Sequence, residues 1–276
     1  MARYLVRRTA ALFVALLGVS ILTFFLAVLA PGDPAEVVLE RQQGQPPTQA
    51  QIDDKRHELG LDRPLAAQYV HWLGDAVRGD FGRSWLRGLE VRDAMAERIP
   101  RTIALALAAG ALAIVVGLPI GVIAATRRNS VVDHLSRFGS LLGASMPSFV
   151  AAYILIFVFA VTLKVVPVFG FGSPAHLILP AICLALGPAA VLARLTRSAM
   201  LDVLGEDYIR TEWAKGMRRR TVLFRHALKN ALIPVVTVIG LFVGHLLGGA
   251  LIIEWVFAWP GMGDLAVSAI HARDYP

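Results

Sequence analysis

Long runs of apolar residues that contain no Asp, Glu, Lys or Arg dominate the chain. A helix needs about 20 such residues to cross the hydrocarbon core, because lipid cannot hydrogen-bond to the backbone. Four runs have this length, and a Pro- and Gly-rich turn precedes a fifth predicted helix that lies within residues 165–193. The five predicted spans cover residues 9–30, 102–126, 138–163, 176–193 and 231–253. This pattern predicts an all-α integral membrane protein.

Composition agrees with the pattern. Hydrophobic residues make up 56% of the 276 residues, only 17% are charged, and the mean hydropathy is +0.61. Soluble domains are about 25% charged, so a soluble protein is excluded. The single cysteine, Cys183, excludes a disulfide scaffold, and we expect it to be an inert thiol inside an apolar helix.

The net charge of +7 is a topology signal. Basic residues cluster before the first span, between the second and third, and in residues 194–229, which hold nine of the 27 Lys and Arg. Lys and Arg favour the cytoplasmic side, so we expect a cytoplasmic N-terminus. The basic segments are short and adjoin the membrane, and nucleic acid is therefore not an expected partner. A cleaved signal peptide is the alternative for the first span, but its length favours an uncleaved helix.

The spans divide the chain into four expected parts. Residues 1–30 form a cytoplasmic stub and the first span, residues 31–101 an extracytoplasmic helical segment, residues 102–253 the membrane core, and residues 254–276 a further extracytoplasmic segment. In the second part, Thr48 and Gln51 have the spacing of a capping box, and Pro64 opens another helix. An apolar stripe on that helix either packs onto the outer ends of the spans or docks a soluble partner: Leu65, Tyr69, Trp72 or Leu73, and Val77.

Residues 201–230 are too polar to span and lie between the fourth and fifth spans. Asp207 can cap a helix that runs through Lys215, and Gly216 can supply the left-handed turn that ends it. A second helix can begin near Thr221 and continue into the fifth span. The segment is then either a docking surface for a protein or an ordinary basic loop that sets topology.

The chain contains no motif for catalysis. A Walker-type phosphate loop needs a Gly-Lys pair, and none is present. The seven histidines lack HExxH or paired-ligand spacing. We therefore expect no enzymatic activity, no metal site and no cofactor bound by this chain.

Small residues, prolines and one histidine mark the predicted spans. Glycines that recur every four residues predict close helix packing: Gly117 and Gly121 in the second span, and Gly240, Gly244 and Gly248 in the fifth. Kinks are possible at Pro119, Pro147, Pro180 and Pro234. His245 is a candidate for contact with a translocated solute, or for a neutral hydrogen bond between helices. The predicted spans contain no carboxylate, which disfavours a proton- or sodium-coupled carrier.

Several stretches together resemble one family. They are Pro31-Gly32-Asp33-Pro34, the run LGLDRPLAAQYVHWLGDAVRGDFGRSW at residues 59–85, Arg101-Thr102, RTEWAKGMRRR with HALKNALIP, and WPGMG with ARDYP. In this order they resemble the inner-membrane permease subunits of the dipeptide, oligopeptide and nickel branch of binding-protein-dependent ABC importers. The resemblance implies the transmembrane domain of a type I importer with six helices, so a sixth span is expected after residue 276.

The family's cytoplasmic EAA loop carries a coupling helix that sits in a cleft of the ATP-binding subunit. This sequence has Arg210-Thr211-Glu212 where the name expects Glu-Ala-Ala, six residues before Gly216. By position, the resemblance assigns coupling to Glu206, Asp207, Tyr208, Ile209, Arg210, Thr211, Glu212, Ala214, Lys215, Gly216 and Met217.

The resemblance also implies partners and a location. These are a second, homologous permease subunit, two ATP-binding subunits that hold ATP and magnesium, and an extracytoplasmic substrate-binding protein, all at the bacterial inner membrane. Peptides, nickel chelates or a related small solute would be transported. The alternative is a passive membrane channel or scaffold whose basic loop serves topology alone.

Overall fold

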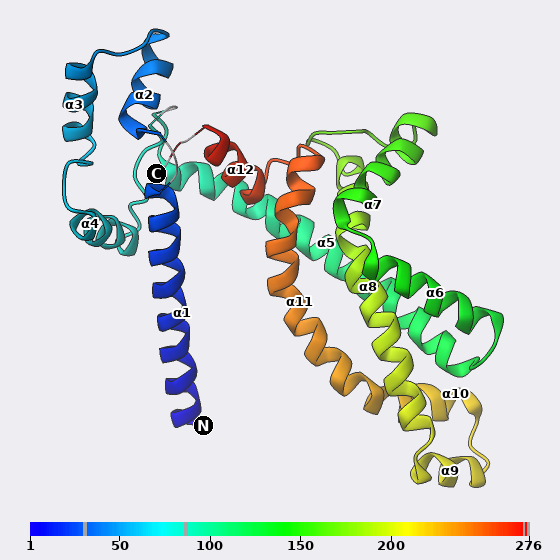
Figure 1. Ribbon diagram of the computed structural model, residues 1–276. Helices are drawn as coiled ribbons and strands as arrows, with labels where there is room; N and C mark the ends of the chain where they lie inside the picture. The colour runs from blue at the N-terminus through cyan, green and yellow to red at the C-terminus, as the bar shows by residue number, and fades with distance from the viewer. Residues whose placement is uncertain (30–31, 86–87, 273, 275–276) are drawn as a thin grey trace. The chain divides into compact units, whose positions relative to one another are not determined.

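The computed structural model describes residues 1–29, 32–85, 88–272 and 274, which are mostly helical (Figure 1). The chain divides into two compact units, residues 1–97 with 268–276 and residues 98–267. Unit 1 contains α1 (Ala2–Val28), α2 (Pro34–Gln43), α3 (Gln49–Glu58) and α4 (Leu65–Val77). Unit 2 contains α6 (Val131–Ser145), α7 (Ser148–Leu155), the π-helix η1 (Ile156–Thr162), α8 (Ala175–Leu204), α9 (Asp207–Ala214), α10 (Arg219–Thr221), the π-helix η2 (Val222–Ala227) and α11 (Leu228–Val256). Two helices, α5 (Val91–Thr126) and α12 (Met262–Ala272), have residues in both units.

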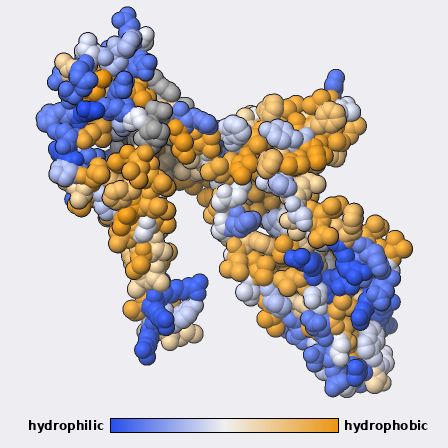
Figure 2. All heavy atoms as spheres, viewed as in Figure 1, coloured by the Kyte–Doolittle hydropathy of each residue, from blue (hydrophilic) through white to orange (hydrophobic). Residues whose placement is uncertain are grey.

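In unit 1, α1 exposes apolar side chains along its whole length and carries charged ones only near its N-terminal end (Figure 2). Helix α4 packs against the second half of α1. The ring of Phe24 lies 5.4 Å from that of Tyr69 and 6.0 Å from that of Trp72, and the hydroxyls of Ser20 and Tyr69 are 2.9 Å apart. The middle of the apolar stripe on α4 therefore packs on a span end, whereas Leu65 and Val77 stay exposed.

Helices α2 and α3 form a small separate cluster around Ala35, Leu39 and Ile52. The predicted capping box is confirmed, since the backbone N–H of Thr48 donates to Gln51 Oε1 at 2.8 Å. Helix α2 was not predicted from the sequence. Asp33 caps it by accepting a hydrogen bond from the backbone N–H of Ala35 at 3.0 Å.

Four helices of the described residues are long and apolar enough to cross a membrane, or five if a bent pair counts as one span. The predicted third span over residues 138–163 is bent at Pro147, one of the four prolines where a kink was predicted. Helices α6 and α7 meet there at 108°. Met146 has extended backbone with ψ 122°, because the ring of Pro147 excludes the helical conformation from the residue before it. The prolines inside α5, α8 and α11 interrupt no helix.

Two helices are longer than the apolar windows predicted. Helix α5 begins eleven residues before residue 102, and α8 continues eleven residues beyond Ala193. The extension of α8 keeps an apolar face, with Thr196, Ala199 and Met200 buried. Gly117 lies where α5 crosses α8, and a Cβ there would be 2.7 Å from the carbonyl oxygen of Ala189. Gly121 makes a similar approach to the carbonyl of Ala193.

The remaining predicted packing glycines lie on an open face of α11. A Cβ added at Gly240, Gly244 or Gly248 would meet no described atom within 4 Å. His245 is exposed on the same helix, and its ring is 6.4 Å from that of Phe242. The close packing predicted for these three glycines would therefore need another chain, and it stays a prediction, as does the role of His245.

Candidate coupling site

The polar segment between α8 and α11 forms the predicted helix and turn. Glu206 occupies the N-cap position and Asp207 the first helical position, so the predicted cap was one residue too late. Gly216 ends α9 with φ +74°, as its position predicted. The N–H of Gly216 donates to the carbonyl of Trp213 at 2.9 Å and that of Met217 to the carbonyl of Glu212 at 3.3 Å. This bonding is a Schellman motif, which requires the left-handed residue.

One side chain anchors α9 to the rest of unit 2. Ile209 is fully buried in an apolar cluster that includes Val122 of α5, Met200 of α8, and Val222 and Ala227 of η2. The resemblance assigned Ile209 to coupling; its side chain is buried within unit 2, and its role in coupling stays a prediction. Its burial contributes about 2 kcal/mol toward holding α9 in place.

Polar contacts tie the same segment to two long helices. The side-chain amide of Asn230 in α11 donates to the hydroxyl of Tyr208 at 2.7 Å. The guanidinium of Arg219 donates to the carbonyl of Thr126, the last residue of α5, at 3.3 Å. These contacts attach the segment around α9 to the C-terminal end of α5 and to the beginning of α11.

The outer side of the segment is polar and exposed, and polar colour gathers at this end of unit 2 (Figure 2). Glu212 and Met217 are half-buried, and the other predicted coupling residues are exposed: Glu206, Asp207, Tyr208, Arg210, Thr211, Ala214, Lys215 and Gly216. The prediction omitted Trp213, whose side chain is 41% exposed. A tryptophan in a short polar helix was a usable signal, because such residues dominate binding at protein interfaces.

A buried ion pair supports the helices beside this segment. Asp133 at the start of α6 is fully buried and accepts hydrogen bonds from Arg197 Nε at 2.5 Å and Nη2 at 2.9 Å. It also accepts one from the backbone N–H of Asn129 at 2.9 Å. The pair joins the turn between α5 and α6 to α8. Sequence reasoning did not identify it because its partners lie 64 positions apart.

Asp133→Asn is expected to lower the free energy of unfolding by about 3 kcal/mol, because it leaves the guanidinium of Arg197 without its charge partner in a buried site. Chemical denaturation in detergent micelles measures this. The control is Asp207→Asn, whose ion pair with Arg210 is exposed and contributes at most about 0.5 kcal/mol. Equal free energies of unfolding for the two variants would show that the buried pair contributes no more stability than the exposed one.

A second buried carboxylate, Glu254, lies at the end of α11 that is farther along the chain from α9. Glu254 is fully buried, one residue beyond the predicted end of the fifth span. It accepts hydrogen bonds from Thr102 Oγ1 at 2.6 Å, from the N–H of Gly263 at 2.6 Å and from that of Asp264 at 3.4 Å. Thr102 Oγ1 in turn accepts the N–H of Met262 at 2.8 Å. These contacts satisfy the first N–H groups of α12, where a negative charge is favoured. We call these residues the Glu254 cluster.

The WPGMG segment fits closely around this cluster. A Cβ at Gly261 would lie 2.1 Å from Glu254 Oε1, and one at Gly263 would lie 2.3 Å from Leu251 Cα. Trp259 Nε1 donates to the carbonyl of Arg101 at 3.2 Å. Glycine is therefore required at both positions by lack of space, and the cluster fixes where α12 begins relative to α11.

The described residues hold no group of three His, Cys, Asp or Glu that could bind a metal ion. The features that unit 2 does provide are an anchored helix with an exposed polar face at one end of α11, and a buried carboxylate that holds a second helix at the other.

Comparisons with known proteins agree with this arrangement. Residues 117–276 match the family described as binding-protein-dependent transport system inner membrane component, and residues 1–106 match the N-terminal family of the same membrane components. The chain is 45% identical over its whole length to a protein named as a peptide permease in Brucella suis, covering 89% of that protein. It is 41% identical to an oligopeptide transport system permease of Bacillus subtilis and 42% identical to a glutathione transport system permease of Escherichia coli, again over its whole length and 90% and 89% of theirs.

A solved structure shares the fold. The MetNI methionine ABC transporter, in an inward-facing conformation, matches 64% of this chain and 81% of its own with a TM-score of 0.53 at 20% identity. The matches to both family descriptions and to full-length relatives agree with the helical membrane architecture. The chain therefore belongs to the family of inner-membrane permease components of binding-protein-dependent ABC importers.

Proposed function

We propose that this permease forms half of the translocation path of an ATP-driven importer for di- or oligopeptides or a related small solute, and that α9 couples its helices to ATP hydrolysis in separate subunits. The proposal rests on one observation, which is that α9 is anchored on its inner side and exposed on its outer side. Its inner side is fixed by Ile209, and its outer side presents Arg210, Trp213 and Lys215 to a partner. A loop that only set topology would need neither the anchor nor an exposed tryptophan.

The contacts of α9 support a coupling role. Force applied to its outer side would reach α8 through the apolar cluster around Ile209, and α11 through the Tyr208–Asn230 hydrogen bond. Closure of ATP-binding subunits would favour one arrangement of these helices, and hydrolysis would restore the other. A partner can shift such an equilibrium only as far as its affinity differs between the two states.

The partners follow from family membership and from the charges of the chain. Binding-protein-dependent importers work with ATP-binding and substrate-binding proteins; here we propose two ATP-binding subunits, which hold ATP and magnesium, and a second permease subunit. Arg3, Arg7 and Arg8 precede the first span, which supports a cytoplasmic N-terminus in the inner membrane. The cytoplasmic side is then the side of α9, where ATP is available.

The substrate class rests on the relatives. Their names refer to peptide, oligopeptide and glutathione transport, and all three are substrates with peptide-type bonds. Helix α11, with its open glycine face and His245, is the proposed wall of the translocation path.

The test is purification of the permease from membranes in mild detergent, followed by identification of co-purifying subunits and assay of ATP hydrolysis in proteoliposomes. We expect an ATPase and a second permease to co-purify, and peptide-loaded binding protein to stimulate hydrolysis. Trp213→Ala is expected to weaken association with the ATPase at least about thirtyfold, because truncation of a central interface tryptophan typically costs about 2 kcal/mol or more.

Arg128→Ala is the matched control for Trp213→Ala. Arg128 is exposed on the turn between α5 and α6, outside α9, and its removal should leave ATPase association intact. Recovery of a folded permease without an ATPase, under conditions that preserve other importers, would instead favour a passive channel or scaffold.

A further inference from the structure

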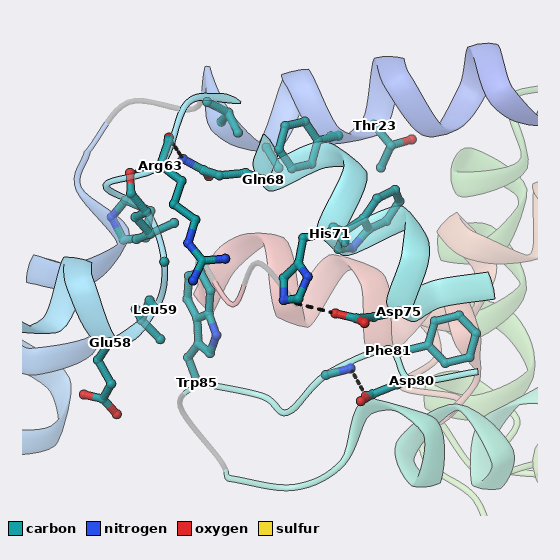
Figure 3. A pocket seen from close by; sticks show the side chains of 18 of the residues that line it. Thr23, Glu58, Leu59, Arg63, Gln68, His71, Asp75, Asp80, Phe81 and Trp85 are labelled. Carbon is teal, nitrogen blue, oxygen red and sulfur yellow. Dashed lines mark hydrogen bonds and ion pairs between the residues drawn. The ribbon is translucent and has the colours of Figure 1, made fainter. Parts of the chain in front are cut away.

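Unit 1 contains a hollow of about 520 Å³ beside the C-terminal end of α1 (Figure 3). Its apolar wall comes from the last two turns of α1, including Phe24 and Val28, and from Trp72 of α4. Its rim carries charges of both signs, with Arg63 on one side and Asp75 and Asp80 on another. The volume is in the range of small-molecule sites, which run from about 300 to 1,000 Å³.

The position of the hollow relative to the membrane follows from α1 alone. The basic residues before the span end at Arg8, and 20 residues of helix separate Arg8 from Val28. That length is about 30 Å, which equals the thickness of the hydrocarbon core. The hollow therefore begins where acyl chains end and head groups start. Helix α4 supports this depth, because it is seen nearly end-on beside α1 and so runs across it (Figure 1), and its Tyr69 and Trp72 are typical of the membrane interface.

Arg63 and Asp80 are held in place and can still bind a ligand, whereas Asp75 already lies 3.5 Å from both His71 Nε2 and Arg78 Nη1. Gln68 Nε2 donates to the carbonyls of Leu61 and Arg63 at 3.1 and 2.7 Å, which fixes the loop that carries Arg63. The Arg63 side chain extends into the hollow between Trp85 and His71 (Figure 3). Among the described residues its guanidinium has no hydrogen bond or ion pair. Asp80 Oδ1 accepts the N–H of Gly82 at 2.9 Å, and the other carboxylate oxygen has no hydrogen bond or ion pair among the described residues.

We propose that this hollow binds a zwitterionic phospholipid with a primary ammonium, that is, phosphatidylethanolamine. Arg63 pairs with the phosphate, Asp80 accepts a hydrogen bond from the ammonium, and the start of an acyl chain lies along Phe24 and Trp72. A head group without an ammonium would leave the carboxylate of Asp80 without a donor, because Asp75 is already paired with His71 and Arg78. A choline head group has no N–H to donate, so the geometry selects ethanolamine. Phosphate–arginine pairs are strong because both groups are charged and planar donor pairs match the oxygens.

The experiment is native mass spectrometry of the purified importer complex after partial removal of lipid. An equimolar mixture of dioleoyl phosphatidylethanolamine, phosphatidylglycerol and phosphatidylcholine is added back, and the bound lipids are counted. We expect preferential retention of the ethanolamine lipid, reduced about tenfold in Arg63→Gln and in Asp80→Asn, and restored in part in Arg63→Lys. Arg92→Gln, which changes an exposed arginine of unit 1 outside the hollow, should retain the lipid fully.

Two further arms identify the source of the head group. Water-soluble glycerophosphoethanolamine should displace the lipid only weakly, because it lacks the acyl chain that packs on α1. Displacement by a dipeptide at similar concentration would show a peptide site instead, and would overturn the lipid proposal. Equal retention of the three lipids, or unchanged retention in Arg63→Gln, would also overturn it. The test requires no transport, so failure of the proposed substrate or of coupling leaves its outcome readable.

Discussion

Gly216→Val is expected to reduce transport and transport-linked ATP hydrolysis at least tenfold, with the membrane core still folded. Gly216 has φ +74°, where a residue with a Cβ is strained by about 1–2 kcal/mol and a β-branched one by more. The strain opens the Schellman turn that ends α9, and Trp213 and Lys215 then lose their orientation toward the ATP-binding subunit. Peptide uptake and ATP hydrolysis in proteoliposomes measure the effect, and circular dichroism reports the fold.

Gly44→Val is the matched control. Gly44 follows α2 with φ +66°, and like Gly216 it has no described atom within 4 Å of an added Cβ. The two substitutions therefore impose similar backbone strain in similarly open surroundings. If Gly44→Val impaired ATP hydrolysis as strongly as Gly216→Val, backbone strain in general would explain the loss and α9 would have no special role.

Glu254→Leu is expected to lower the free energy of unfolding by about 4 kcal/mol and transport to less than about a tenth. The substitution keeps side-chain volume but leaves the hydroxyl of Thr102 and the N–H groups of Gly263 and Asp264 without an acceptor in a buried site. Each such group costs about 1–3 kcal/mol. Helix α12 would then lose its fixed start beside α11. Denaturant unfolding in detergent and peptide uptake measure the two effects.

Glu254→Gln separates the loss of charge from the loss of hydrogen bonding at this position, and Glu40→Leu is the control at an exposed site. Glu254→Gln retains one carbonyl oxygen and should lose about half as much stability as Glu254→Leu. Glu40→Leu, at an exposed glutamate of α2, should change stability by at most about 0.5 kcal/mol. A Glu254→Leu protein as stable as wild type would show that the Glu254 cluster does not hold α12.

Features that depend on residues close together in the chain were predicted correctly from the sequence. Apolar runs located the spans, since a membrane helix satisfies its own backbone and needs only about 20 apolar residues. The Thr48–Gln51 capping box and the turn at Gly216 were predicted correctly, because each involves residues within one or two helical turns. The motifs in order along the chain also identified the family, and the comparisons confirmed it.

Contacts between side chains that are far apart in the chain became known from the three-dimensional fold. Asp133 and Arg197 lie 64 positions apart, and Thr102 and Glu254 lie 152 apart. No local pattern marks such pairs. Glu254 follows directly after a predicted span, and from the sequence a carboxylate in that position is expected to lie at the surface. The structure also showed which of the candidate prolines breaks a helix, since the chain bends at Pro147 whereas α5, α8 and α11 continue through their prolines. Local sequence sets helix formation, whereas burial and partner choice depend on where the chain brings distant helices together.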